Sequence, residues 1–253
     1  MYFESHAHYD DEKFNEDRYD LIETMHKNGI DYIVNAASDL QSSRFGIEIA
    51  EKFPYYYSAV GVHPHEVETL TEKDIETIKE YTKNEKVVAI GEIGLDYYYD
   101  FSPRDLQRKW FIRQLELAKE LDMPVIIHSR DAAQECFDII KESNVTKGVI
   151  HSYSGSSQMA NDYINLGFYI GIGGMLTFKN ARKPVETVKN IPIERILIET
   201  DSPYLSPVPV RGTRNNSQNL KYICEKIAQI KQIPHEKVAK ITLENAKELF
   251  SLK

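Results

Sequence analysis

Short apolar segments rich in β-branched and aromatic residues alternate with amphipathic segments along the whole chain. Apolar runs bounded by turn residues are typical of buried strands, whereas apolar residues three and four apart indicate helices. The predicted strands cover residues 1–3, 31–37, 55–62, 86–96, 124–130, 147–155, 168–174 and 194–201. The predicted helices cover residues 17–29, 40–53, 71–84, 102–122, 131–143, 156–167, 180–191, 217–232 and 234–250.

Each predicted strand is followed by a predicted helix, and this alternation indicates a parallel sheet. Eight such units in 253 residues match the size of a closed barrel. We therefore predict an α/β fold, a (β/α)8 TIM barrel with extra helices at the C-terminus. No linker or low-complexity tract divides the chain, so residues 1–253 are expected to form a single domain. An open, doubly wound sheet is the alternative fold.

The composition of the chain limits the classes of protein to which it can belong. The chain is 42% apolar and 28% charged, which is ordinary for a globular domain. It contains no apolar stretch long enough to span a membrane and no basic, apolar leader at its start. Cys136 and Cys224 fall in predicted helices without metal-ligand spacing, so we expect reduced thiols and a cytoplasmic protein. The net charge of −8 is unfavourable for wrapping long nucleic acids.

Candidate metal ligands recur where predicted strands end. His6 and His8 are two residues apart, so on a strand both imidazoles point to the same face. In a TIM barrel the carboxyl ends of all strands meet in one axial pocket. The candidates from strands one, four, five, six and eight are His6, His8, Glu92, His128, His151 and Asp201. Six such residues at matched positions are hard to explain as packing, so we predict a metal centre.

Four imidazoles and two carboxylates exceed the three protein ligands that one catalytic zinc ion needs. They suit two divalent ions, which can hold a bridging hydroxide and clamp both oxygens of a displacement at phosphorus. Zinc, manganese or magnesium are the candidates, and imidazole-rich ligation suits zinc, manganese or iron better than magnesium. The predicted catalytic groups are Glu92, as the bridging carboxylate, and Asp201, as both a ligand and the base. The remaining predicted ligands are His6 and His8 beside Asp201 for one ion, and His128 and His151 for the other.

Six segments together resemble the TatD family of metal-dependent hydrolases, within the amidohydrolase superfamily. They are "SHAH", "GVHPHE", "AIGEIGLDYY", "PVIIHSRDA", "HSYSGS" and "LIETDSPYL…RGTRN". The resemblance implies a (β/α)8 barrel and a divalent-metal-dependent phosphodiesterase that acts on DNA as a 3′–5′ exonuclease. It places the family's ligands on the six residues named above. It also implies DNA ends or single-stranded DNA as the substrate, while a deacylase role on mischarged tRNA has been proposed for some members.

The chain departs from the family pattern at a few positions. Glu4 stands where Asp is usual, and Ser152 and Tyr153 stand where Cys and Phe are common. Asn216 replaces a common Glu, which leaves the role of that carboxylate open.

Several residues near the strand ends are candidate substrate contacts. His65, Arg130 and Arg214 are the predicted phosphate contacts, because a guanidinium can bind a phosphate through two hydrogen bonds. One of the tyrosines at 97–99 stacks on a base or, as is more common, packs under a loop. Two alternatives to the nuclease stay open: hydrolysis of an ester, amide or lactone at the same site, and a barrel that only binds its ligand.

Overall fold

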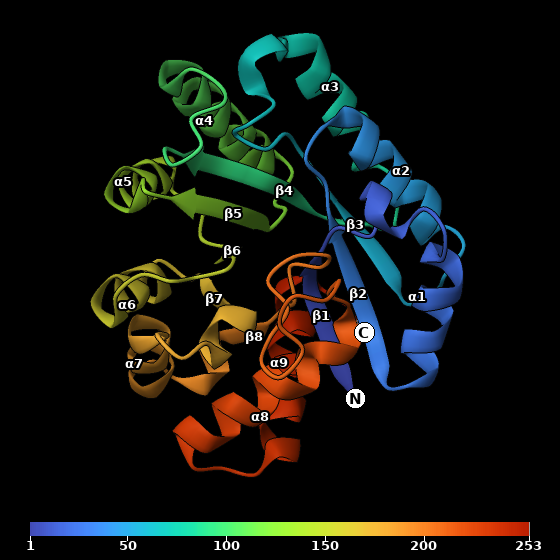
Figure 1. Cartoon of the computed structure of the whole chain (residues 1–253). Helices are drawn as coiled ribbons and strands as arrows, with labels where there is room; N and C mark the ends of the chain where they lie inside the picture. Colours follow the sequence, from blue (N-terminus) through green and yellow to red (C-terminus); the bar gives the residue numbers. More distant parts are fainter. Residues whose placement is uncertain (253) are drawn as a thin grey trace.

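The structure, a computed structural model, describes residues 1–252, which form eight strands and nine α-helices in alternation (Figure 1). The strands are β1 (Tyr2–Ala7), β2 (Ile30–Ala36), β3 (Tyr56–Val60), β4 (Val87–Asp96), β5 (Val125–Arg130), β6 (Gly148–Ile150), β7 (Tyr169–Ile172) and β8 (Ile196–Ile198). The α-helices are α1 (Arg18–Lys27), α2 (Leu40–Ala50), α3 (Glu72–Tyr81), α4 (Arg104–Glu120), α5 (Ala133–Ser143), α6 (Ser157–Asn165), α7 (Arg182–Asn190), α8 (Leu220–Lys231) and α9 (His235–Leu249). Short 3-10 helices are η1 (Glu12–Phe14), η2 (Val67–Thr69), η3 (Gly174–Thr177), η4 (Ile193–Arg195) and η5 (Ser217–Asn219).

The sheet follows the order of the chain. Each strand pairs in parallel with the next one, from β1 to β8. Figure 1 shows helices α1 to α8 arranged in a ring outside these strands. A doubly wound sheet would instead reverse its strand order at a switch point. The predicted (β/α)8 barrel is therefore confirmed, and the open-sheet alternative is wrong.

The barrel closes between β1 and β8 through a short seam. Ala7 forms an isolated parallel bridge with Ser202, and the His8 N–H donates to the Ser202 carbonyl at 2.7 Å. The Asp201 N–H donates to the His6 carbonyl at 3.0 Å. The two ends of the sheet thus meet at the residues that were predicted to bind metal.

Glu4 reinforces this seam from a fully buried position. Its carboxylate accepts the Thr200 N–H at 2.8 Å and the Thr200 hydroxyl at 2.6 Å. Burial raises the pKa of Glu4 to about 8. The carboxyl group of Glu4 therefore joins the first strand to the segment after the last.

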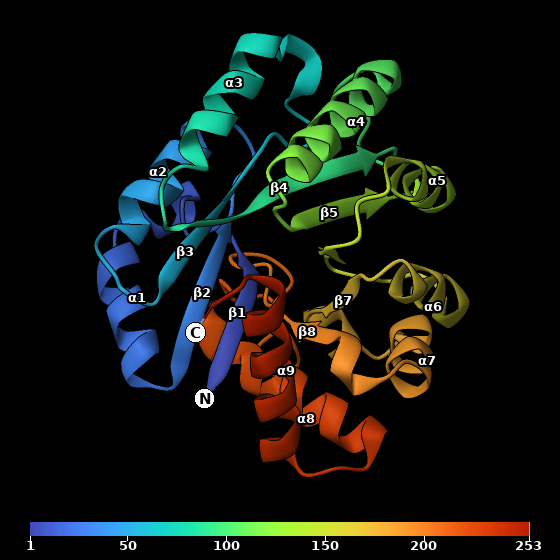
Figure 2. The same ribbon diagram turned by 180° about the vertical axis from the view of Figure 1, so that it is seen from behind.

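Two apolar layers stabilise the barrel. The larger one lies between the strands and the surrounding helices. The smaller one is a buried cluster of inward side chains from all eight strands together with residues of α9, such as Leu243 and Leu249. Two helices were predicted at the C-terminus. The first, α8, follows β8 and belongs to the ring, so only α9 is an extra helix (Figures 1 and 2).

All eight strands differ from their predicted bounds, and β1, β6 and β8 differ most. β1 extends to Ala7 and includes His6, whereas β6 and β8 end before His151 and Glu199. Ser152 and Asp201 have φ angles of 45° and 57°, in the left-handed region that a strand does not contain.

Over residues 1–252, no helix combines the length and the apolar character needed to cross a bilayer.

Candidate metal centre

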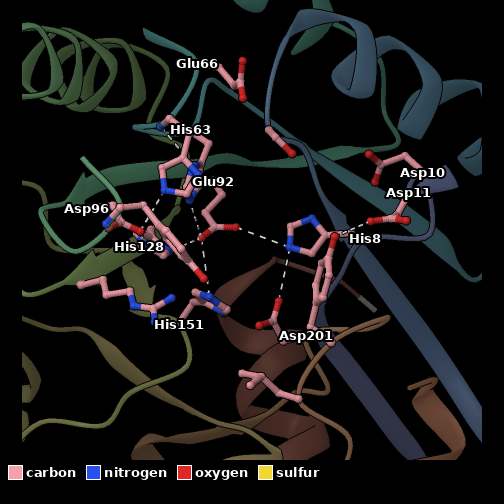
Figure 3. A pocket seen from close by; sticks show the side chains of 16 residues that line it. His8, Asp10, Asp11, His63, Glu66, Glu92, Asp96, His128, His151 and Asp201 are labelled. Carbon is pink, nitrogen blue, oxygen red and sulfur yellow. Dashed lines mark hydrogen bonds and ion pairs between the residues drawn. The ribbon is translucent and has the colours of Figure 1, made fainter. Parts of the chain in front are cut away.

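A cavity of about 590 Å³ opens at the carboxyl ends of the strands. Figure 3 shows Glu92 near its centre, with His8 and Asp201 on one side and His128 and His63 on the other. The lining residues are His8, Asp10, Asp11, Ser38, His63, His65, Glu66, Glu92, Asp96, Tyr99, His128, Arg130, His151, Asp201, Tyr204 and Leu205. His6 lies buried beneath, with its ring stacked on that of His151 at 3.7 Å between centroids. The structure thus brings all six predicted ligands together.

Irregular strand pairing brings some of these ligands into the barrel. Strict alternation from the inward Phe3 would send Ala7 inward and both histidines of the pair outward. The pairing of β1 with β2 shifts between Glu4 and Ala7, and Ala7 packs in the outer layer instead. The pairing of β4 with β5 shifts in the same way between Ile90 and Ile93, around Glu92. Such bulges re-aim side chains next to functional sites.

One group of donors surrounds a single point beside Glu92. His6 Nε2 lies 3.1 Å from His8 Nε2 and 3.2 Å from Glu92 Oε2. Asp201 Oδ1 lies 3.4 Å from His8 Nε2 and 3.7 Å from His6 Nε2. Ligands about 2.0–2.1 Å from a tetrahedral metal ion are about 3.4 Å apart. These residues therefore have the donor types and the spacing that a divalent ion requires.

A second group faces the other oxygen of the same carboxylate. His128 Nδ1 lies 2.8 Å from Glu92 Oε1, and His151 Nε2 lies 3.5 Å from it. His63 Nε2 is 3.6 Å away from the same oxygen. Glu92 thus has one oxygen in each donor group.

The imidazoles keep the carboxylates ionised. Burial alone would raise the pKa of Glu92, but the surrounding histidines, His151 and His6 first among them, hold it well below its usual range. The pKa of Asp201 is lowered in the same way against its burial, chiefly by the hydrogen bond with His8. Ionised carboxylates with nitrogen donors are a ligand set for zinc, manganese or iron.

The far nitrogens of three histidines lie within about 3 Å of carboxylate or carbonyl oxygens. His128 Nε2 lies 3.0 Å from Asp96 Oδ2, and His151 Nδ1 lies 3.0 Å from Glu199 Oε1. His8 Nδ1 lies 2.8 Å from the Ala36 carbonyl. Metal-bound histidines usually donate their other N–H to such a group, which leaves the inner nitrogen free to ligate.

Asp96 and Glu199, which are fully buried, were not among the predicted site residues. From the fourth and the eighth strand, only Glu92 and Asp201 were predicted. Asp96 is four residues after Glu92, and Glu199 is two residues before Asp201. The same alternation of faces that selected the ligands could therefore have identified both carboxylates.

His63 differs from these histidines. Its Nδ1 accepts the His65 N–H at 3.2 Å, so in the neutral ring Nε2 carries the proton. Burial, followed by the neighbouring His128, lowers the pKa of His63 well below its usual value, which keeps the ring neutral. In this tautomer His63 presents its Nε2–H to the cavity, and the same residue forms, with Glu92 and His128, a group of donors close enough to hold a metal ion.

The contact between Asp96 and His128 leads to a prediction for metal affinity. We expect Asp96→Asn to weaken metal binding about 10- to 100-fold, because the amide no longer fixes the His128 ring. Titration of the metal-free protein, monitored by calorimetry, measures this affinity. The exposed Asp105→Asn in α4 is the matched control. Unchanged affinity in Asp96→Asn would show that the carboxylate does not orient the ligand.

The predicted substrate contacts have different positions. His65 lines the cavity, but its Nε2 is hydrogen-bonded to Asp96 at 2.9 Å. Arg130 also lines the cavity. The structure does not bring Arg214 there, because its guanidinium binds the Asp17 carboxylate and donates to the Lys13 carbonyl at 2.8 Å. Arg214 is therefore held by Asp17 outside the cavity lining, and its predicted phosphate contact stays a prediction.

Comparisons with known proteins agree with this geometry. The family model described as TatD-related DNase matches residues 3–251. An uncharacterized metal-dependent hydrolase, YabD of Bacillus subtilis (strain 168), is 43% identical over 100% of both chains. Another, YcfH of Escherichia coli (strain K12), is 34% identical over 91% of each chain. The crystal structure of YjjV, a TatD homolog from Escherichia coli K12, superposes with a TM-score of 0.94 at 29% identity and covers 100% of this chain and 98% of that one. The chain therefore belongs to the family of TatD-related DNases and is a metal-dependent hydrolase of that type.

Proposed function

We propose that this protein is a DNA phosphodiesterase with two divalent ions, which removes nucleotides from strand ends. The observation that carries the proposal is the position of Glu92. One of its oxygens faces His6 and His8, and the other faces His128 and His151. A carboxylate in this position suits a bridge between two ions. The 3′–5′ direction is expected from the resemblance to the family.

The chain's own residues then have separate tasks. Bound divalent ions supply the positive charge that offsets negative charge developing on the phosphoryl oxygens. Asp201 lines the cavity, is ionised and accepts the proton of the attacking water. His63 donates its Nε2–H to a phosphoryl oxygen, and Arg130 binds the neighbouring phosphate.

The distribution of charge supports a substrate with a free end. Among the described residues that line the cavity, Arg130 alone carries a guanidinium or ammonium group. The whole chain has a net charge of −8. Affinity for DNA then depends on the ions and on few phosphate contacts at one barrel mouth, which admits a strand end more readily than a continuous duplex.

This model predicts how activity depends on DNA topology and salt. We expect the metal-loaded protein to degrade 3′-labelled single strands and to leave closed circular duplex intact. With two or three contacted phosphates, log(kcat/KM) should fall with log salt at a slope of about −1 to −2. A panel of esters and lactones, assayed beside the DNA, tests the alternative hydrolase. Efficient cutting of closed circles, or a slope several times steeper, would contradict recognition of the end.

A further inference from the structure

Three aromatic side chains are exposed in the loop that follows β4. Tyr98, Tyr99 and Phe101 are 58%, 47% and 64% exposed. The third tyrosine of the run, Tyr97, is only partly exposed and its hydroxyl donates to Glu135 at 2.8 Å. Large exposed apolar groups that gather in one place indicate a binding surface. We call Tyr98, Tyr99 and Phe101 the aromatic platform.

The rings of the platform are ordered against one another and against the cavity wall. Tyr99 and Phe101 are stacked, with centroids 5.3 Å apart and planes 24° apart. His65, which lines the cavity, meets both rings edge-on. Tyr99 itself lines the cavity that holds the candidate metal ligands. The platform is therefore continuous with the metal centre.

The backbone beneath the platform is tied to a metal ligand. Asp96 Oδ1 accepts the Tyr98 N–H at 3.0 Å and the Tyr99 N–H at 2.9 Å, while Asp96 Oδ2 faces His128. Ser102 fixes the far end of the loop through a hydrogen bond of 2.8 Å to the His65 carbonyl. One carboxylate thus sets the position of the rings relative to the site of hydrolysis, before any ligand binds.

Arg130 adds a cation to this surface. Its guanidinium carbon lies 4.1 Å from the centroid of the Tyr98 ring and 4.6 Å from that of Tyr99. Over residues 1–252, no carboxylate forms an ion pair with it, in contrast to the pairing of Arg214 with Asp17. A guanidinium whose face rests on aromatic rings keeps its N–H edge available for a phosphate. Arg130 also lines the adjoining hollow of about 770 Å³, together with Tyr98.

Aromatic faces beside an unpaired guanidinium match the chemistry of a single-stranded nucleotide. We propose that the aromatic platform stacks on the base next to the scissile phosphate, while Arg130 binds the phosphate of the same strand. This inference rests on the proposed function and names the part of the substrate that the enzyme recognises. A base can stack there only when it is unpaired, and every base has a face to stack, so recognition favours single strands and tolerates any sequence.

The test compares substrates with and without a base. We expect Tyr99→Leu to raise KM for a 3′-labelled single strand about 10-fold, within the range for loss of one stacked base. Hydrolysis of glycerophosphocholine, an aliphatic phosphodiester with neither a base nor an aromatic ring, should fall much less. Tyr99→Trp should restore the KM for DNA. Tyr19→Leu, at an exposed tyrosine on α1 that also has a lysine over its ring, is the matched control.

An abasic residue beside the scissile bond provides a second readout. Removal of the base should raise KM for the wild type and add little to the effect of Tyr99→Leu, because both changes remove the same contact. Equal losses on DNA and on the small diester would show that the loop only supports the metal centre, and would overturn the proposal. Normal KM for DNA in Tyr99→Leu would also overturn it. If the metal-loaded wild type hydrolyses neither substrate, the proposed function itself fails, and the stacking proposal falls with it.

Discussion

Glu92→Ala should lose both metal binding and hydrolysis. Its two oxygens face the two donor groups, so a single substitution removes a ligand from each. We expect turnover to fall at least about 1,000-fold, the upper range for one preorganised electrostatic group. Metal analysis of the protein, purified without chelator, should show a sharp fall in bound metal relative to the wild type.

Thermal unfolding provides a readout of the same substitution without substrate. A ligand at 100 times its Kd stabilises the folded state by about 2.7 kcal/mol. At about 2–4 °C per kcal/mol for a chain of this size, added Zn²⁺ or Mn²⁺ should raise the Tm of the wild type by about 5–10 °C. Glu92→Ala should show little of this rise, whereas the exposed Glu142→Ala in α5 should show all of it. Full metal occupancy together with full activity in Glu92→Ala would end the two-ion model.

Asp201→Asn tests the proposed base with little change of shape. Asp201 has a φ of 57°, a left-handed conformation that asparagine also adopts readily, so the backbone should be preserved. The amide cannot accept the proton of the attacking water, and we expect kcat to fall at least about 100-fold. The donor group around His128 does not include Asp201, so metal should still bind there.

Two measurements separate these effects. Metal content decides whether the loss in Asp201→Asn comes from ligation, and single-turnover rates at saturating metal isolate the chemical step. Asp138→Asn, at an exposed position of α5, is the control. Near-normal turnover in Asp201→Asn would assign the base to another group.

The sequence predicted the fold and the ligands for the same physical reason. Eight alternating units specify a barrel. Because the strand ends converge in a barrel, His128 and Asp201 could be predicted to lie close together. Strand lengths were less predictable. β8 ends at Ile198 because the following residues leave the sheet geometry to form the seam with β1, and that contact joins opposite ends of the chain.

Contacts between loops that are far apart in the chain could not be predicted from the sequence either. The hydrogen bond of Arg214 with Asp17 joins segments that no periodicity relates, so the arginine looked available for phosphate. The sequence pattern also does not show which of the tyrosines at 97–99 is packed and which are exposed. In the structure the Tyr97 hydroxyl binds Glu135 of α5 and its ring lies under Arg104 of α4, whereas Tyr98 and Tyr99 are exposed.

The seam between β1 and β8 also determines when the site first forms during protein synthesis. His6 and His8 leave the ribosome well before Asp201 and Ser202, which hold them in place and lie far along the chain. A nascent chain that folds from its N-terminus therefore carries the histidine pair without its partners. A chain released before Asp201 by a premature stop codon would lack this part of the site, so the candidate metal centre is completed only late in translation.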